Sequence, residues 1–332
     1  MARCQQPLAA GTKAHAGLIQ YFAQVMTHST AVDQPAQRAP GGALRARLPD
    51  GRLHFQHGPI DLIMGVEGAA SVVQAATEAA WQRFETILPE LVAELSALRR
   101  PIPQAAPVAP ALSGAVARRM AQACWPHRNQ YITCMAAVAG AVADEVLEAL
   151  LSAGPLDRAY VNNGGDIAIH LSAGQSYAVG LLANVDHLHV RAGQLLADGR
   201  FTLLPHMGIG GVATSGWRGR SQSLGIADSV TVFATCAAQA DAAATLVANA
   251  VNVQHPAIRR APADTVKDDT DLGSLLVTLD VGALPDTAVN QALDSGEREA
   301  QGLLAAGHIK GAVLVLQGQA RMVGLEHLGA SG

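Results

Sequence analysis

The stretch from 208 to 245 gathers the chain's densest set of glycines, hydroxyl groups and arginines. Guanidinium groups form paired hydrogen bonds with phosphates and carboxylates, and glycines leave backbone amides uncovered, so these residue types suit a small polar ligand. Trp217 could stack on a planar ring, but a polar surface loop around a buried tryptophan would explain the composition about equally well. The candidate binding residues here are Thr214, Ser215 and Gly216, and the candidate catalytic residues are Arg218, Arg220 and Asp228.

Asp241 and Thr245 close the same stretch and are spaced one helical turn apart. Residues at i and i+4 lie on one face of a helix. A carboxylate, a hydroxyl and a nearby backbone carbonyl would make a hard oxygen site that suits Mg²⁺ bridging phosphates. The alternative is that Asp241 caps the start of its helix while Thr245 packs, and a single Asp–Thr pair on its own favours this second interpretation.

A second polar turn, Asn162-Asn163-Gly164-Gly165-Asp166, lies between two apolar runs. Paired glycines adopt positive φ readily and let a phosphate or carbonyl approach the backbone. Asp166 could hold a ribose hydroxyl or a metal, or it could stabilise only its own turn, which is the commoner role of Asn, Gly and Asp. No G-x-G-x-x-G sequence opens a βαβ unit in this chain, so a Rossmann-type dinucleotide site is not indicated.

The composition is that of a core-rich globular chain. Of its 332 residues, 49% are hydrophobic and 15% are charged, which excludes a disordered protein, and a net charge of −4 gives no electrostatic footprint for nucleic acid. No apolar run approaches the roughly 20 residues that cross a bilayer, and the N-terminus makes a poor signal-peptide core. The four cysteines show no regular framework, as expected for reduced thiols. We therefore expect a cytoplasmic protein without a membrane or nucleic-acid partner.

Order is expected to begin near residue 43. Residues 1–42 lack sustained periodicity and indicate a poorly ordered extension, with a short helix over Ala14–Met26. The alternation around Asp50-Gly51 predicts a hairpin, and Ile60–Met64 predicts a third strand. Residues 43–332 are expected to form a single domain, which two halves in close contact could also build.

Three helices are expected in the first half of the chain. Apolar residues recur at helical spacing over Ala69–Leu98, and Pro89 should kink or divide that helix. A proline-rich linker then leads to a second helix over Ala115–Cys124. Residues 132–155 predict an alanine-rich helix whose small residues permit close packing, or close approach of a ligand, with packing as the default. Its polar side is expected to carry Asp144, Glu145 and Glu148.

The second half is expected to contain mainly strands. They flank the Asn162–Asp166 turn and cover 176–183, 186–193, 229–233 and 275–284. The first half of 208–245, before the strand at 229–233, is expected to be a loop. Helices are expected after 233 and over Thr287–Ala306, with a closing strand or hairpin over 311–324. Hairpins outnumber strand–helix alternations and no internal repeat is visible. This favours an α+β fold over a doubly wound parallel sheet.

These segments, in this order, resemble the ApbE-like superfamily, best known for FAD:protein FMN transferases. The resemblance rests on NNGGDI (162–167), the VGL strand that follows, VATSG (212–216), SVTVFA (229–234) and ADAAAT (240–245). Longer segments, among them RLPDGRLHFQHGPIDL and ATSGWRGRSQSLGIADSVTV, are similar to a cytoplasmic branch of that superfamily with no assigned reaction. The resemblance spans about residues 44–318. It implies an α+β, T-fold-like architecture of sheets wrapped by helices, with a flavin site between them.

The resemblance also implies roles for individual residues. The Gly-Gly-Asp turn and the Thr-Ser-Gly loop would hold the dinucleotide, the Asp–Thr pair would ligate Mg²⁺ with a backbone carbonyl, and an aspartate of the alanine-rich helix would lie near the adenine. The residues of this chain at those positions are Asn163, Gly164, Gly165, Asp166, Thr214, Ser215, Gly216 and Asp144 for FAD or FMN, and Asp241 and Thr245 for the metal.

One segment departs from the family pattern. The transferases carry H-x-x-D-P-x-T-G between the ATSG loop and the SVTV strand, whereas residues 217–228 are WRGRSQSLGIAD and contain no histidine. Transfer of FMN to a protein threonine is therefore not implied, and Arg218 and Arg220 would supply charge in place of the missing segment.

We expect an ApbE-like protein that binds a flavin nucleotide or another phosphorylated small molecule with Mg²⁺, with FMN or nucleotidyl transfer as the candidate reaction. One alternative is a non-catalytic carrier of a flavin or metabolite. Another is an enzyme of sulfur or amino-acid metabolism that reuses the pocket. A homodimer is compatible with the sequence.

Overall fold

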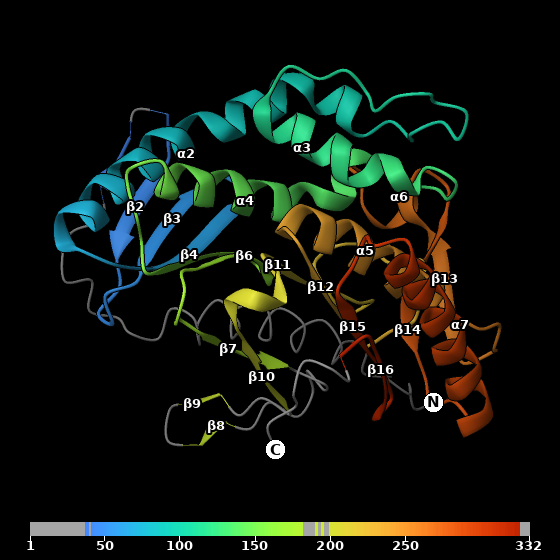
Figure 1. Ribbon diagram of the computed structural model, residues 1–332. Coiled ribbons are helices and arrows are strands. Elements are labelled where there is room, and N and C mark those ends of the chain that lie inside the picture. Colours follow the sequence, from blue (N-terminus) through green and yellow to red (C-terminus); the bar gives the residue numbers. More distant parts are fainter. Residues whose placement is uncertain (1–36, 40, 182–189, 192–193, 196–198, 326–332) are drawn as a thin grey trace, which may run out of the picture.

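The computed structural model describes residues 37–39, 41–181, 190–191, 194–195 and 199–325. Within these ranges, strands and six α-helices form the α+β fold expected from the sequence. Figure 1 shows helices stacked over one face of a large sheet and a small hairpin beneath the other face. The helix predicted over Ala14–Met26 lies outside the described residues, as does most of the strand predicted over 186–193.

A ten-stranded sheet, antiparallel at every pairing, is the centre of the fold. The predicted hairpin around Asp50-Gly51 and the third strand after it form one end of this sheet, and the predicted closing hairpin forms the other. In spatial order the strands are β1 (Gln37–Arg38), β2 (Leu44–Arg47), β3 (Leu53–His57), β4 (Ile60–Glu67), β5 (Arg158–Asn163), β6 (Asp166–Leu171), β11 (Gly211–Ser215), β12 (Ser229–Ala234), β15 (Gly311–Leu316) and β16 (Gln319–Val323).

Three long connections leave this sheet and return to it. The first, between β4 and β5, carries α2 (Ala70–Leu98), α3 (Ala115–Cys124) and α4 (Val138–Leu151). The second, between β6 and β11, carries β7 (Tyr177–Leu181), β8 (Val190–Arg191), β9 (Gln194–Leu195) and β10 (Gly199–Leu203). The third, between β12 and β15, carries α5 (Ala237–Ala250), β13 (Ile258–Pro262), α6 (Ala263–Val266), β14 (Leu276–Val281) and α7 (Asp286–Ala305).

The helices cover the sheet with two apolar clusters that meet at α5. Under α2, the ring of Phe55 lies 5.1 Å from that of Trp81 and 5.5 Å from that of Phe84. Alanines on one side of α5 join this cluster, and those on another side join a second cluster with β12, β15 and α7. On the opposite face of the sheet, the β7–β10 hairpin packs through Phe201, whose ring lies 5.2 Å from that of Phe233.

Three sequence expectations need correction. Of the two effects expected of Pro89, division of the helix is wrong, because α2 runs unbroken past it, and a kink stays a prediction; the proline is exposed while Ile87 and Leu91 are buried. Residues 211–215 are not loop but strand β11, because β6 and β12 supply hydrogen-bonding partners on both sides. Asp144 does not lie on a polar face of α4 but is 7% exposed, because its carboxylate binds the start of α5.

Close contact between α4 and α5 explains the small residues of the alanine-rich segment. A Cβ added at Gly140 would lie 2.3 Å from the carbonyl oxygen of Ala237, so the two helices meet at backbone distance. The expectation that these small residues serve packing is therefore confirmed. A 3₁₀ turn, Cys134–Ala137, precedes α4 and takes the place of the first turn of the longer helix predicted.

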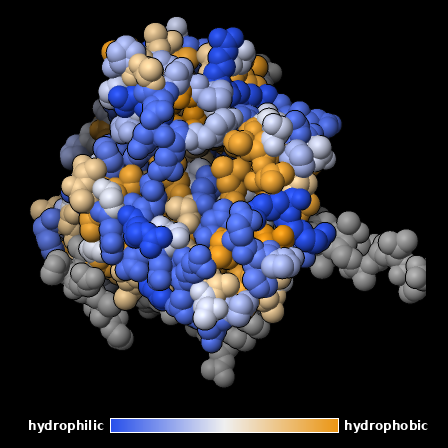
Figure 2. Space-filling model, turned by 90° about the vertical axis from the view of Figure 1, so that its right-hand side faces the viewer, coloured by the Kyte–Doolittle hydropathy of each residue, from blue (hydrophilic) through white to orange (hydrophobic). Residues whose placement is uncertain are grey.

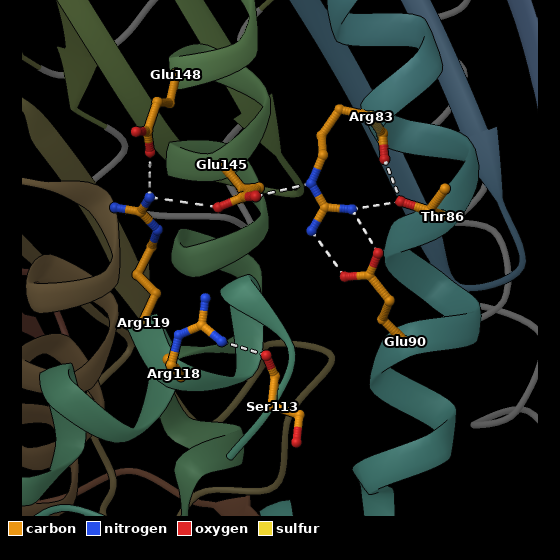
Figure 3. A network of polar contacts seen from close by, with 8 residues as sticks. All are labelled: Arg83, Thr86, Glu90, Ser113, Arg118, Arg119, Glu145 and Glu148. Carbon is orange, nitrogen blue, oxygen red and sulfur yellow. Dashed lines mark hydrogen bonds and ion pairs between the residues drawn. The ribbon is translucent and has the colours of Figure 1, made fainter. Parts of the chain in front are cut away.

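Ion pairs tie α2 and α3 to α4 on the outer side of the helical layer (Figure 3). Arg83 of α2 contacts Glu145 at 2.7 Å and Glu90 at 2.8 Å, and Arg119 of α3 contacts Glu148 at 2.6 Å. A groove of about 750 Å³ runs between α2 and the start of α3 beside this network. These arginines and glutamates neutralise one another and connect the three helices.

The side of the molecule that carries β13, β14 and α6 presents apolar surface among polar residues (Figure 2). Val266, Leu276 and Leu279 of these elements are exposed. Across the described ranges, no helix combines the length and apolarity that a membrane crossing requires.

Candidate functional site

The turn between β5 and β6 forms one side of the candidate site. Gly164 and Gly165 adopt φ values of 69° and 116°, which favour glycine. The side-chain oxygen of Asn162 accepts a hydrogen bond from the N–H of Gly165 at 2.9 Å, and Asn163 Nδ2 donates to the carbonyl oxygen of Ala139 at 3.1 Å. The predicted strand–turn–strand is therefore confirmed, and the turn is fixed to the start of α4.

Asp166 begins β6 immediately after this turn and lies beside β11. Its Oδ1 accepts a hydrogen bond from the N–H of Thr214 at 3.3 Å. Burial raises the pKa of Asp166 to about 7, although the Thr214 N–H and the charge of Arg220 both act to lower it. Its surroundings in the folded protein therefore favour the protonated carboxyl more than water does.

Asp241 lies on α5 and faces the start of α4. Its Oδ2 accepts a hydrogen bond from the N–H of Gly140 at 3.0 Å, and the Ala139 amide stabilises the same carboxylate. Burial raises the pKa of Asp241 well above its usual value, and the charge of Asp166 raises it further. Asp166 and Asp241 thus form a pair of neighbouring carboxylates, an arrangement that favours either a proton or a cation between them.

Thr245 follows Asp241 by one turn of α5, as predicted. Both residues are half-buried. Asp241 does act as a helix cap, but it caps α4 and not its own helix. The sequence could suggest the capping role but not the helix that is capped.

Asp144 mirrors this arrangement from α4. Its two carboxylate oxygens accept hydrogen bonds from the N–H groups of Ala237 and Ala238, the first residues of α5, at 2.9 Å each. Burial raises the pKa of Asp144, and these two hydrogen bonds oppose the rise. Each helix therefore supplies the carboxylate that caps the other, which holds Asp241 in place beside Asp166.

The loop after β11 is fixed at its base by Asp228. One carboxylate oxygen of Asp228 accepts a hydrogen bond from Trp217 Nε1 at 3.3 Å and lies 3.5 Å from Arg218 Nε, while the other accepts from the N–H of Gln317 at 2.6 Å. The Arg218 guanidinium also lies over the Trp217 ring at 4.7 Å. Two of the predicted catalytic residues, Arg218 and Asp228, are thus paired with each other.

Arg220, in contrast, reaches the turn between β5 and β6. A Cβ added at Gly164 would lie 1.8 Å from Nη2 of Arg220, so the guanidinium rests against bare backbone. Its charge acts to lower the pKa of Asp166, against the larger effect of burial.

The remaining predicted binding residues line β11 and its end. The Thr214 hydroxyl lies 2.9 Å from the hydroxyl of Thr231 on β12, and Thr214 itself is exposed. Ser215 is half-buried. Gly216 packs against the backbone of Asp228, where an added Cβ would lie 2.4 Å from the carbonyl oxygen.

The structure thus brings together Asp166, Thr214, Asp241, Gly164 and Arg220. Three contributors were not predicted as site residues: the Ala139 and Gly140 amides and the hydroxyl of Thr231. The small-residue run at 136–141 was the one sequence signal for the first two.

The donor atoms of the site suit the Mg²⁺ that the resemblance implies. In the described part of the chain, no group of three or more His, Cys, Asp or Glu side chains is arranged to hold a metal ion. The site offers two carboxylates and the Thr245 hydroxyl. Mg²⁺ commonly binds to one or two carboxylates and completes its shell with water and substrate phosphates, so these hard oxygen donors fit it.

The chain is similar to known proteins in sequence and in structure. A family model described as "AbpE bacteria" matches residues 45–322. A UPF0280 protein of Methanothermobacter thermautotrophicus is 41% identical over 126 residues, which is 38% of this chain and 45% of that protein. A UPF0280 protein of Methanopyrus kandleri is 40% identical over 131 residues, 38% of this chain and 47% of that protein. The match thus spans about half the length of these curated relatives.

Two solved structures are similar at low sequence identity. The apo form of the Pseudomonas stutzeri flavinyl transferase ApbE is 12% identical, with 90% of this chain and 98% of that chain covered and a TM-score of 0.42. The ApbE protein of Thermotoga maritima is 15% identical, with 80% of each chain covered and a TM-score of 0.35. Both TM-scores are below 0.5, so membership rests on the family model, which spans most of the chain. The resemblance inferred from the sequence is confirmed: the chain belongs to this bacterial, ApbE-like family.

Proposed function

We propose that this protein binds a flavin nucleotide, FAD or FMN, or a similar phosphorylated small molecule, together with Mg²⁺ at the pair of carboxylates Asp166 and Asp241. The observation that carries the proposal is the position of this pair, half-buried, beside an exposed arginine and a turn of paired glycines. Burial and mutual repulsion make the doubly ionised pair costly without a cation. A ligand with phosphate groups would complete the coordination of that cation.

Each residue would have a distinct part in this binding. Asp241 and Thr245 would hold Mg²⁺, with Asp166 as the neighbouring carboxylate, and the ion when bound would neutralise phosphate charge. The α4 amides of Ala139 and Gly140 fix the orientation of Asp241. The Gly164-Gly165 turn and β11 from Thr214 to Gly216 would line the ligand's other side.

The first test is Mg²⁺-dependent binding of FAD, measured by isothermal titration calorimetry on wild type and D241N. Loss of the metal-facing charge should weaken FAD binding in the presence of Mg²⁺ about 10- to 100-fold, in the range seen when metal sites lose a supporting group. D280N is the matched control, because Asp280 pairs with Arg259 on exposed strands away from the site. Wild-type protein that binds FAD equally well with Mg²⁺ and with EDTA would contradict the metal part, and no FAD binding would contradict the flavin part.

The reaction we propose is attack of an acceptor hydroxyl on the FMN phosphorus of bound FAD, which forms a phosphoester, breaks the pyrophosphate bond and releases AMP; in the nucleotidyl version the attack is on the AMP phosphorus and FMN leaves. Arg220 would stabilise charge that develops on the leaving phosphate. The measurement is release of AMP from FAD by purified protein with Mg²⁺ and a candidate acceptor, followed by chromatography.

A non-catalytic carrier is the second candidate, and the arrangement of the 217–228 loop favours it. Arg218 and Asp228 are committed to each other, and the segment has no histidine. Tight FAD binding without AMP release, with any acceptor offered, is the outcome that distinguishes carriage from transfer.

A further inference from the structure

The two arginines of the 217–221 loop have different surroundings. Arg218 is held at the loop base, with its Nε 3.5 Å from an Asp228 oxygen and its guanidinium over Trp217. The loop base is closed by backbone bonds as well, from the N–H of Trp217 to Ala227 at 3.0 Å and from that of Gly219 to Gly216 at 3.1 Å. Arg218 is thus built into the loop that carries Arg220.

Arg220 is exposed, and no described residue forms a hydrogen bond with it or an ion pair within 4.0 Å. The Gly164 backbone nevertheless restricts the position of the guanidinium. The guanidinium occupies the space that any side chain at 164 would fill. A Cβ there would come within 1.8 Å of Nη2 and 3.0 Å of Cζ. The Arg220 guanidinium is therefore held beside the Gly164-Gly165 turn, and within the described part of the chain its N–H groups have no acceptor.

We propose that Arg220, seated on Gly164, is the residue that contacts the phosphoryl group of the ligand, while Arg218 is a positioning residue that orders the loop through Asp228 and Trp217. This rests on the proposed function only in that the ligand is phosphorylated; it requires neither a flavin nor a transfer reaction. A guanidinium fork binds two phosphate oxygens at once, which a lysine cannot do. Gly164 is then required because it leaves room for the guanidinium.

The probe is inorganic pyrophosphate with Mg²⁺, titrated calorimetrically into the full-length protein. R220Q should weaken binding about 10- to 100-fold, the loss expected for charge-assisted hydrogen bonds, and R220K should recover little of it because the paired geometry is lost. R259Q is the matched control: Arg259 is an exposed arginine on β13 that pairs with Asp280. Binding by R220Q equal to that of wild type would overturn the proposal.

The positioning role of Arg218 is tested by Trp217 fluorescence together with rescue by lysine, which a direct contact with the ligand would not predict. R218Q should shift the fluorescence of Trp217 and weaken pyrophosphate binding, and R218K, which can keep the ion pair with Asp228, should restore most of both. If R218K fails to restore binding although the fluorescence is wild-type, Arg218 contacts the ligand and the division of roles is wrong.

The role of Gly164 is tested by comparison with a second glycine of positive φ. At that second glycine an added Cβ would meet no other atom. G164A should weaken pyrophosphate binding to a similar degree as R220Q, since it displaces the guanidinium. G174A is the control, because Gly174 has φ of 83° in the β6–β7 turn and nothing lies within 4 Å of an added Cβ. Equal pyrophosphate affinity in G164A and G174A would show that the contact between Arg220 and Gly164 is not needed for binding.

Failure of this inference can be told apart from failure of the proposed function. Wild-type protein that binds Mg²⁺–pyrophosphate through Arg220 but does not bind FAD would refute the flavin and keep the inference. FAD binding that is unchanged in R220Q would refute the inference and keep the flavin.

Discussion

The ionisation of Asp166 should make the free energy of unfolding depend on pH. Burial raises the pKa of its carboxyl to about 7 in the folded state, from about 4 in an unfolded chain. The folded protein then binds more protons than the unfolded one between these values, so the free energy of unfolding should fall as pH rises from about 4 to about 7. Above that range the cost of the buried charge is fully present.

D166N removes this cost while its side-chain oxygen can still accept the Thr214 N–H. We expect D166N to melt about 2 °C or more higher than wild type at pH 8 in EDTA, the shift that a gain of about 1 kcal/mol or more gives in a domain of this size, and to differ little at pH 4. Differential scanning calorimetry across pH measures this, with D280N as the control. A melting temperature of D166N below that of wild type at pH 8 would show that the ionised carboxylate stabilises the fold.

At the scale of elements, the contact between α4 and α5 leaves no room for one methyl group. In G140A the new Cβ would meet the Ala237 carbonyl carbon at 2.5 Å and oxygen at 2.3 Å, both backbone atoms that cannot rotate away. We expect G140A to lower the free energy of unfolding by about 2 kcal/mol or more, measured by urea denaturation. The strain should outweigh the better helix propensity of alanine.

G302A provides the opposite case in the same experiment. Gly302 is exposed on α7 with nothing within 4 Å of an added Cβ, so alanine there should raise stability by up to about 1 kcal/mol. If both variants are stabilised, the close approach of α4 to α5 is wrong.

Local sequence patterns predicted correctly those elements whose secondary structure depends mainly on their own residues. The helix over Ala115–Cys124 is found with the predicted bounds, and the helix predicted over Thr287–Ala306 differs by one residue at each end. Strand β11, with glycine and small residues, lacks a strand pattern and owes its state to its neighbours β6 and β12. Strand β13 contains two arginines and a proline and was missed for a similar reason.

The candidate site could be predicted by residue type but not by pairing. Asp166, Asp241 and Arg220 were selected from the sequence, yet nothing in it indicates that Asp144 and Asp241 each cap the other's helix across 93 to 101 residues. Nor does spacing distinguish Arg218, which is held by Asp228, from Arg220, which rests on Gly164. These relations depend on tertiary contacts.

At the scale of the molecule, α5 contributes to both apolar clusters that the helices form with the sheet. Each of the two clusters includes residues of α5, so removal of this helix would take part of the core from both. This supports the single domain expected over residues 43–332. We therefore expect one cooperative unfolding transition in urea, with coincident midpoints by far-ultraviolet circular dichroism and by tryptophan fluorescence.

The tryptophans allow the two halves to be compared. Trp81 and Trp125 belong to the first cluster or pack against it, whereas Trp217 lies in the loop held by Asp228 next to β15. In W217F the fluorescence midpoint reports the first half alone, and it should match that of circular dichroism. Separate midpoints would mean that the halves are independent domains.

The exchange of caps between α4 and α5 also has a consequence for synthesis on the ribosome. When α4 has been translated, the carboxylate that its first turn needs lies about a hundred residues further along the chain. Until that segment emerges, the amides of Ala139 and Gly140 can pair only with water, and the aspartate at 144 has no helix to bind. The contact that fixes the first turn of α4 can therefore form only after α5 has been synthesised, so it depends on a pairing of high sequence separation.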